Sequence, residues 1–205
     1  MIQANNDPVL VDMPMPIRTP RLTLRPPQAG DGPALAASTA ETWDDLAPWM
    51  PWATDYASNT DPQAREAFLR RERGNFILRE TIMLLGFIEG RDDPVIYTGF
   101  SDFDWKTRNF TIGYWVPKSA QGNGYAAEAS NALTRYAFAV LDANRVQISH
   151  ADGNDYSRRV IEQLGFPKEA VTAKTHWLPD GRVSDNHIYA LTETSPLPDI
   201  DVNWG

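Results

Sequence analysis

Residues 121–126 read QGNGYA, and the segments on either side of these two glycines decide the fold. From Tyr125 to Val140 apolar residues recur at steps of three and four, which is typical of an amphipathic helix. The run Phe110 to Val116, before the glycines, is short and apolar, as in a strand. A glycine loop between a strand and a helix places backbone N–H groups at the helix N-terminus, where an anion can bind.

Further segments carry strand or helix patterns. Apolar runs or alternation predict strands at Arg21–Arg25, Ile82–Ile88, Pro94–Phe100, Arg145–Ser149, Val171–Leu178 and Ser184–Leu191. Helical spacing and start signals predict one helix after Asp31, one from Asp61 to Arg79 and one from Asp155 to Leu164. This order predicts an α+β protein with a mixed, mostly antiparallel β-sheet flanked by helices.

The two ends of the 205-residue chain differ from its middle. Residues 1–16 and 194–205 contain several prolines and show little periodicity, so we expect tails without a packing face. Residues 17–193 suit a single domain in length. The sequence therefore predicts one domain between an N-terminal and a C-terminal tail.

The composition argues against several classes of protein. Apolar residues make up 42% and charged residues 22% of the chain, a balance typical of a folded domain. No apolar run approaches the ~18 residues that span a bilayer, and the start does not resemble a secretory signal, so we expect a cytoplasmic protein without a membrane partner. The absence of cysteine excludes thiolate metal sites, and the net charge of −8 argues against nucleic acid as a partner.

The glycine loop alone does not identify a ligand. No Lys-Ser or Lys-Thr pair follows Gly124, which a P-loop requires, and the GxGxxG spacing of a dinucleotide site is absent from the loop. A tight turn with close packing of helix on strand would also explain the two glycines.

The order of motifs resembles the GNAT N-acetyltransferase superfamily and, within it, the group that acetylates the N-termini of ribosomal proteins. The stretches that carry the resemblance are TPRLTLRPP (19–27), APWMPWA (47–53), DFDW (102–105), IGYWV (112–116), QGNGYAAEA (121–129), NDYSRRVIEQLGF (154–166) and YAL (189–191). The resemblance implies a sheet that binds acetyl-CoA as a co-substrate at splayed strands, and it implies no metal.

The resemblance also implies contacts for the cofactor. The pantetheine would run beside the IGYWV strand at Trp115 and Val116, since a strand edge offers groups that match its two amides. Asn154 would contact the CoA arm. The diphosphate would bind on the glycine loop, at Gln121, Gly122, Asn123, Gly124, Tyr125 and Ala126.

Asn154 and Ser157 form an N-x-x-S pair at the start of a predicted helix. On spacing alone, this pair fits a helix cap with Asn154 at the N-cap position. In the resembling group the serine is proposed to protonate the departing thiolate, which implies that catalytic role for Ser157. The two readings are compatible, because an asparagine can cap a helix and contact a ligand together.

The general base has several candidates. Many relatives carry a glutamate just before IGYW, where this chain has Thr111. In the ribosomal-protein group the proposed base is a glutamate on the strand after the N-x-x-S helix, and His176 takes that place as the second catalytic candidate. An imidazole suits amine deprotonation near neutrality, although a lone histidine also fits a packing role. Asp102, Asp104 and a water chain are the alternatives.

These features predict an acetyl-CoA-dependent N-acetyltransferase that acts on a primary amine, with the N-terminus of a protein as the expected acceptor. A small-molecule amine as acceptor, or a regulatory CoA-binding module without catalysis, are the alternatives. The aromatic stretch Trp43 to Tyr56, broken by Pro48 and Pro51, predicts an irregular loop that either packs on the core or walls the acceptor site. A homodimer is one assembly that the resemblance implies.

Overall fold

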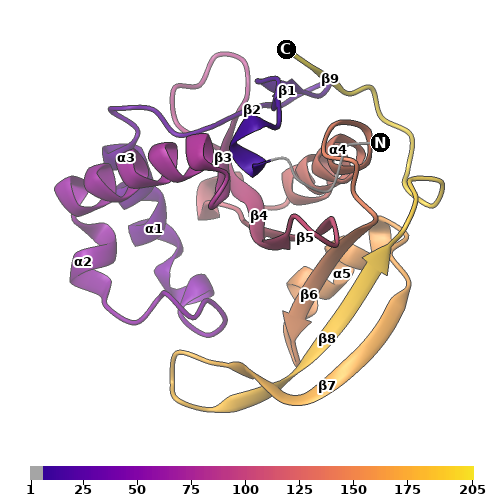
Figure 1. The fold of residues 1–205 in the computed structure, drawn as a ribbon. Coiled ribbons are helices and arrows are strands. Elements are labelled where there is room, and N and C mark those ends of the chain that lie inside the picture. The colour runs from indigo at the N-terminus through magenta and orange to yellow at the C-terminus, as the bar shows by residue number, and fades with distance from the viewer. Residues whose placement is uncertain (1–6) are drawn as a thin grey trace.

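The computed structural model describes residues 7–205 as a nine-stranded open sheet with helices on both faces (Figure 1). The strands lie in the order β7-β8-β6-β5-β4-β3-β2-β1-β9. The pair β5–β6 is parallel and the other neighbouring pairs are antiparallel. The predicted α+β class with a mixed, mostly antiparallel sheet is confirmed.

The elements follow the predicted order. The strands are β1 (Ile17–Arg18), β2 (Thr23–Arg25), β3 (Ile82–Phe87), β4 (Ile96–Asp104), β5 (Asn109–Trp115), β6 (Arg145–Ala151), β7 (Lys168–Trp177), β8 (Val183–Leu191) and β9 (Asn203–Trp204). The helices are α1 (Gly32–Leu46), α2 (Tyr56–Thr60), α3 (Pro62–Leu78), α4 (Tyr125–Val140) and α5 (Asp155–Gln163). The elements that the sequence did not predict, such as β1, α2 and β9, are too short to show a period.

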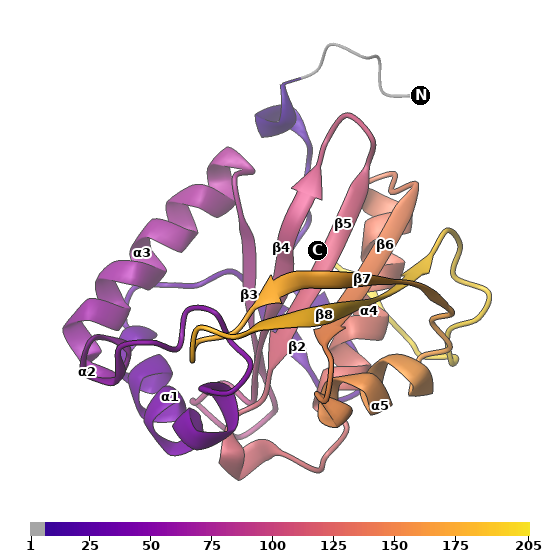
Figure 2. The same ribbon diagram turned by 90° about the horizontal axis from the view of Figure 1, so that it is seen from below.

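Different helices cover the two faces of the sheet (Figure 2). On one face, α1 and α3 enclose a small buried cluster of Leu35, Leu69, Leu85 and Tyr97. On the other face, α4 and α5 cover the larger core, which contains Leu133, Tyr136, Ile148 and Ile161. Within residues 7–205, no helix is long and apolar enough to cross a membrane.

The two parallel strands in the middle of the sheet separate along their length. β5 and β6 pair at residues 109–111 and 145–147, and each then continues for four further residues, to Trp115 and Ala151. A register shift between Phe100 and Asp102 marks a bulge in β4, and bulges bend the strand that carries them. The wedge between residues 112–115 of β5 and 148–151 of β6, here called the splay, opens where β5 leads into the glycine loop.

The C-terminal stretch packs on the domain, so the expectation that residues 194–205 offer no packing face is wrong. Leu197 is buried in the main core, and the ring of Trp204 meets Tyr136 of α4 edge-on at 5.5 Å. The carbonyl oxygen of Pro198 accepts a hydrogen bond of 2.8 Å from the side chain of Asn131. Proline lacks an N–H donor, but its carbonyl can still join a helix to a neighbouring segment.

The N-terminal stretch is described from residue 7 onward, and residues 1–6 of the expected tail lie outside the described chain. Met13 belongs to the main core, and the carbonyl of Pro14 accepts a hydrogen bond of 3.3 Å from Tyr136. This part of the expected N-terminal tail therefore also has a packing face. The domain boundaries at residues 17 and 193 stay a prediction.

Strand β7 forms the opposite edge of the sheet from β9. A bulge between Thr172 and His176 interrupts its pairing with β8. Within this bulge Lys174 has a positive φ of 55°, and its N–H donates to Asp185 Oδ1 at 3.1 Å. The edge is thus bent at its middle instead of running straight.

Candidate active site

The glycine loop has the geometry of an anion site. Gly122 and Gly124 both have a φ of 77°, where a side chain would be strained. Helix α4 starts at Tyr125 with Gly124 at its N-cap. Within residues 7–205, the backbone N–H groups of residues 122–127 have no hydrogen-bond acceptor. Six consecutive free N–H groups at a helix N-terminus fit a diphosphate, whose oxygens only accept.

Two side chains of the loop hold its shape. The amide of Asn123 donates to the carbonyl oxygens of Ala120 and Gln121, at 3.0 and 3.1 Å. Gln121 donates from its side chain to Asp45 at 3.2 Å and from its N–H to Lys118 at 3.3 Å. The structure therefore gives Asn123 and Gln121 a role inside the loop, and leaves the backbone of the following residues to face a ligand.

Trp115 and Val116 end β5 beside the splay. The ring of Trp115 stacks on Tyr97 at 4.3 Å, on the face that α1 and α3 cover. The carbonyl of Val116 accepts a hydrogen bond of 3.4 Å from Gln121. The Trp115 side chain thus belongs to an aromatic cluster, and the unpaired edge of β5 remains available for the amides of an extended ligand.

Asn154 and Ser157 lie at the start of α5. Asn154 Oδ1 accepts a hydrogen bond of 3.2 Å from the N–H of Ser157, so the predicted helix cap is confirmed. The hydroxyl of Ser157 is 3.1 Å from that of Tyr114, a residue of β5. This contact joins the two sides of the splay through a pair of hydroxyl groups.

Tyr114 was not predicted as a site residue. Burial raises the pKa of Tyr114 to about 12, so its hydroxyl stays protonated at neutral pH. Its position in the strand carries a signal, because neighbouring residues of a strand face opposite sides. Once Trp115 is assigned to one face, Tyr114 must point to the other, toward α5.

The candidate bases lie in two separate places. Asp102 and Asp104 pair with Thr111 and Asn109, at the closed end of the β5–β6 pair. The backbone N–H of Lys106 donates to Asp104 at 2.7 Å and lowers the pKa of this exposed carboxyl group. Both aspartates therefore lie near the β4–β5 turn, at the other end of β5 from the glycine loop.

His176 lies on the α5 side of the splay. It is half-buried on β7 and pairs with Ser184 of β8. Ser184 accepts a hydrogen bond of 3.2 Å from the N–H of Asp152, in the turn that leads to α5. Cross-strand partners share a face of the sheet, so His176 faces the side where this turn lies. Within the described residues the side chain of His176 has no hydrogen-bond partner.

A second pair of histidines was not predicted. His150 of β6 and His187 of β8 are cross-strand partners, and their ring centroids are 4.8 Å apart. His187 Nε2 is 3.2 Å from the carboxylate of Asp152. His150 Nε2 and His187 Nδ1 are buried without a partner in the described chain, and burial lowers the pKa of His150. Only strand pairing brings these residues together, so spacing along the chain gives no signal for the pair.

The aromatic stretch Trp43 to Tyr56 is less irregular than predicted. Helix α1 includes Trp43 and α2 begins at Tyr56, which leaves residues 47–55 as the loop. The tip of the Trp49 ring is 3.6 Å from where a Cβ atom on Gly153 would lie. Trp52 is 6.2 Å from Trp115 between ring centroids. The loop therefore spans from the end of β5 to the turn before α5.

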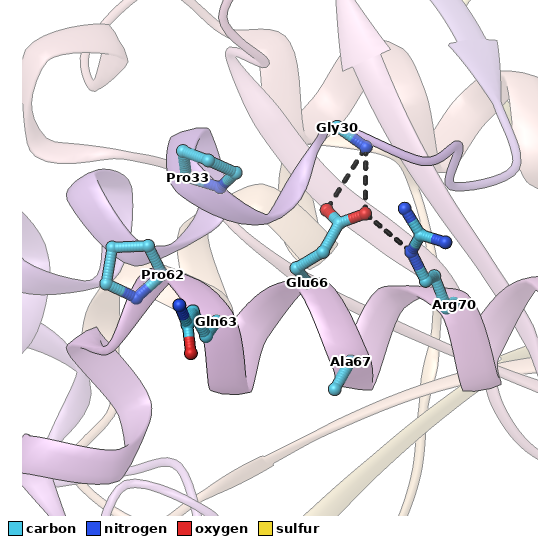
Figure 3. Close-up of a pocket in the computed structure, with 7 residues that line it drawn as sticks. All are labelled: Gly30, Pro33, Pro62, Gln63, Glu66, Ala67 and Arg70. Atoms are coloured by element: carbon cyan, nitrogen blue, oxygen red, sulfur yellow. Dashed lines mark hydrogen bonds and ion pairs between the residues drawn. The ribbon is translucent and has the colours of Figure 1, made fainter.

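A hollow between α1 and α3 is lined by none of the candidate site residues (Figure 3). Its lining residues are Gly30, Pro33, Pro62, Gln63, Glu66, Ala67 and Arg70. Glu66 accepts from Gly32 N–H at 3.0 Å and from Arg70 Nε at 2.7 Å, and the bond from Arg70 lowers the pKa of Glu66. This carboxylate therefore ties α3 to the start of α1. Within residues 7–205, no group of three or more His, Cys, Asp or Glu could hold a metal ion.

A splayed sheet beside an uncapped, glycine-led helix is the architecture of a GNAT-type acetyltransferase. The family described as Acetyltransferase (GNAT) domain matches residues 21–167, and this chain belongs to that family. Its relatives include ribosomal-protein N-acetyltransferases, so the resemblance seen in the motifs is confirmed.

Two relatives and one solved structure illustrate the similarity. A putative ribosomal N-acetyltransferase, YdaF of Bacillus subtilis, is 43% identical over 68 residues, which are 33% of this chain and 37% of the relative. The [ribosomal protein uS5]-alanine N-acetyltransferase of Escherichia coli is 28% identical over 186 residues, 89% of this chain and 93% of the relative. The fold matches Mycobacterium smegmatis RimJ in complex with CoA-disulfide, with a TM-score of 0.79, 23% identity and coverage of 95% of this chain and 93% of that chain.

Proposed function

We propose that this acetyltransferase transfers the acetyl group of acetyl-CoA to a primary amine, and that the amine is a protein N-terminus. One observation carries the proposal: six free backbone N–H groups, of residues 122–127, lie at the start of α4 beside the splay. The match to RimJ, which was solved with a CoA disulfide, supports a CoA derivative as the ligand.

The site residues suit acetyl-CoA as a co-substrate. The N–H groups of the loop would bind the diphosphate, with Gly122, Asn123, Gly124, Tyr125 and Ala126 as the contacts. The edge of β5 at Trp115 and Val116 would bind the pantetheine amides, and Asn154 would contact the arm near the thioester. The thioester supplies the activated acetyl group, and the protein aligns it with the amine.

Ser157 is the proposed general acid. Its hydroxyl lies within 3.1 Å of Tyr114, whose pKa of about 12 keeps the phenol protonated. A serine held in this way can give its proton to the departing thiolate and recover one through the tyrosine. Tyr114 is thus a positioning residue for Ser157.

His176 is the proposed general base. Its imidazole is half-buried on the side where the turn before α5 lies, and it has no partner in the described chain that would occupy its lone pair. Asp102 and Asp104 are weaker candidates, because they lie at the closed end of the β5–β6 pair. A water chain is the remaining alternative.

The aromatic loop supports a peptide acceptor. Trp115 and Tyr97 stack on each other, whereas the neighbouring Trp52 is 40% exposed. The loop therefore presents an exposed apolar surface beside the end of β5. An exposed tryptophan above a rigid sheet suits the first side chains of a peptide. The uS5-alanine relative has a substrate of this kind in its name.

The test is release of CoA thiol from acetyl-CoA with a panel of acceptors. The panel contains peptides that begin with alanine or serine, their N-terminally blocked copies, and small amines such as amino acids and polyamines. We expect release with the free peptides and none with the blocked ones. Faster release with small amines would favour the small-molecule alternative. No release with any acceptor, despite acetyl-CoA binding, would favour a regulatory module.

Two further expectations stay predictions. A homodimer would scatter light as a particle of twice the 23.0 kDa chain mass, and a single mass at micromolar concentration would contradict it. A cytoplasmic location agrees with the expected acceptor, because ribosomal proteins are made there.

A further inference from the structure

A buried carboxylate lies in the first turn of α4, directly after the glycine loop. Glu128 is in the first turn of α4, and its side chain is only 7% exposed. It accepts hydrogen bonds from Thr19 Oγ1 at 2.6 Å, from the N–H of Arg21 at 3.1 Å and from Arg21 Nε at 2.6 Å. All of these donors belong to the TPRLTLRPP stretch, for which the proposed reaction gives no role.

The side chain of Arg21 extends from this carboxylate to the glycine loop. Its Nη1 donates to the carbonyl oxygen of Asn123 at 2.9 Å, and its Nη2 forms an ion pair with Glu128. The guanidinium lies 5.0 Å from the ring centroid of Tyr125, and its Nη2 is 3.6 Å from where a Cβ on Gly124 would lie. One side chain thus contacts Asn123 and Tyr125 and lies beside the glycine between them.

The charges explain why a guanidinium is needed here. A carboxylate one turn below the free N–H groups would repel a diphosphate if it were unpaired, and the low exposure of Glu128 reduces screening by water. Arg21 neutralises this charge. Its own side chain is 50% exposed, and its Nη1 still donates to the loop at the carbonyl of Asn123. A lysine could not bind Glu128 and the Asn123 carbonyl in one planar fork.

We propose that Arg21 is the positioning residue of the diphosphate loop: held by Glu128, it fixes the loop and offsets the carboxylate, and thereby sets the affinity for the diphosphate of acetyl-CoA. This inference rests on the proposed function, in which the loop binds that cofactor. It also assigns a role to the TPRLTLRPP stretch, which places Thr19 and Arg21 beside α4.

The test compares two acetyl donors. Acetyl-CoA carries the diphosphate, whereas S-acetylpantetheine ends before it. Calorimetry should show that Arg21→Gln lowers the affinity for acetyl-CoA by about tenfold, the scale of one charge-assisted hydrogen bond. Arg21→Lys should lose most of the same affinity. In both variants kcat/KM should fall for acetyl-CoA and stay within about twofold of wild type for S-acetylpantetheine.

Two further variants control this experiment. Arg18→Gln removes a nearby arginine of β1, which donates to the carbonyl of Gly205, and it should leave acetyl-CoA affinity unchanged. Adding Glu128→Gln to Arg21→Gln removes the unpaired carboxylate and should restore part of the lost affinity. Melting temperatures show whether each variant is folded. If Arg21→Gln does not fold, the comparison is made between Arg21→Lys and the double variant that adds the isosteric Glu128→Gln to it.

Two outcomes would overturn the inference. Unchanged acetyl-CoA affinity in a folded Arg21→Gln protein is one, and an equal loss with both donors is another, because it would indicate a general structural role. A wild-type protein that neither binds nor uses acetyl-CoA would instead refute the proposed function, so the two failures are distinguishable.

Discussion

The glycine loop and the far side of the splay are built in different ways. The loop presents backbone N–H groups of six neighbouring residues, 122–127, and its side chains serve to hold that backbone in place. The α5 side presents side chains from separate segments: Ser157 on α5, His176 on β7, and His150 with His187 across β6 and β8. One half of the site is therefore made locally, and the other half depends on the fold.

This difference predicts different sensitivities. A backbone site tolerates most side-chain changes but fails where a glycine is lost, since φ is then strained. A side-chain site loses function when one hydroxyl or imidazole is removed, even though the fold remains. Substitutions on the two sides should therefore separate cofactor affinity from turnover.

The largest effect is expected at Ser157. Ser157→Ala should lower kcat by roughly 10²-fold, the usual scale of general acid catalysis, with acetyl-CoA affinity nearly kept. Steady-state kinetics and calorimetry measure the two quantities. Tyr114→Phe removes only the partner hydroxyl and should give a smaller loss of kcat. If Ser157→Ala weakened acetyl-CoA binding while kcat stayed the same, the serine would contribute to cofactor affinity and not to turnover.

His176→Ala should lower kcat to a similar degree near pH 7 and recover at high pH, where the acceptor amine loses its proton without a base. A pH–rate profile measures this recovery, and a melting curve checks the fold. A folded variant with an unaltered pH–rate profile would indicate that Asp102, Asp104 or water is the general base instead of His176. Asp102→Asn is then the matched variant at the closed end of the β5–β6 pair.

On the loop, Gly124→Val should lower acetyl-CoA affinity by at least about tenfold. Gly124 has a φ of 77°, and the added Cβ alone would lie 3.6 Å from Arg21, so the loss arises from backbone strain and from the bulk beyond Cβ. Calorimetric titration with acetyl-CoA measures the effect. Gly181→Val is a control with a similar φ of 86° on the β7–β8 turn, and unchanged acetyl-CoA binding in Gly124→Val would refute the prediction.

The smallest effect concerns stability and pH. Burial lowers the pKa of His150 below 6.5, so the unfolded chain binds its proton more readily than the native protein. Above pH 6.5 His150 is neutral in both states and does not affect stability. As the pH falls from 6.5 through the native pKa of His150, the preferential protonation of the unfolded chain lowers the free energy of unfolding. His150→Phe keeps a ring beside His187 and should lose this acid sensitivity.

Urea denaturation of wild type and His150→Phe between pH 7.5 and about 5 measures that difference. As the pH falls, the unfolding free energy of wild type should decrease relative to that of His150→Phe. A gap that is constant with pH would mean that the native pKa of His150 is unshifted, and would remove the buried pair from any role in pH dependence.

The sequence predicted the half of the site that is local. Tyr125 to Val140 is helical as expected, and the N-x-x-S cap at Asn154 has the predicted hydrogen bond. Both depend on residues within one or two turns, where spacing determines geometry. Gly122 and Gly124 adopt the left-handed backbone for which glycine is suited.

The sequence could not predict contacts that depend on strand pairing. His150 and His187 are 37 positions apart and meet because β6 and β8 are neighbours, although β7 lies between them in the chain. Tyr114 and Ser157 meet for a similar reason, across the splay. The packing of Leu197 was also missed, because a single apolar residue among prolines carries no period.

The bend at Lys174 has a consequence for the behaviour of the protein in concentrated solution. A long edge strand such as β7 offers unpaired backbone groups to the edge of another molecule, which is a common route to aggregation. Here a positive φ of 55° interrupts the strand, and the N–H of Lys174 is occupied by Asp185. A charged bulge at mid-strand prevents a second edge from aligning over the full length of β7. The bulge at Lys174 thus disfavours edge-to-edge assembly of the protein into ordered fibres.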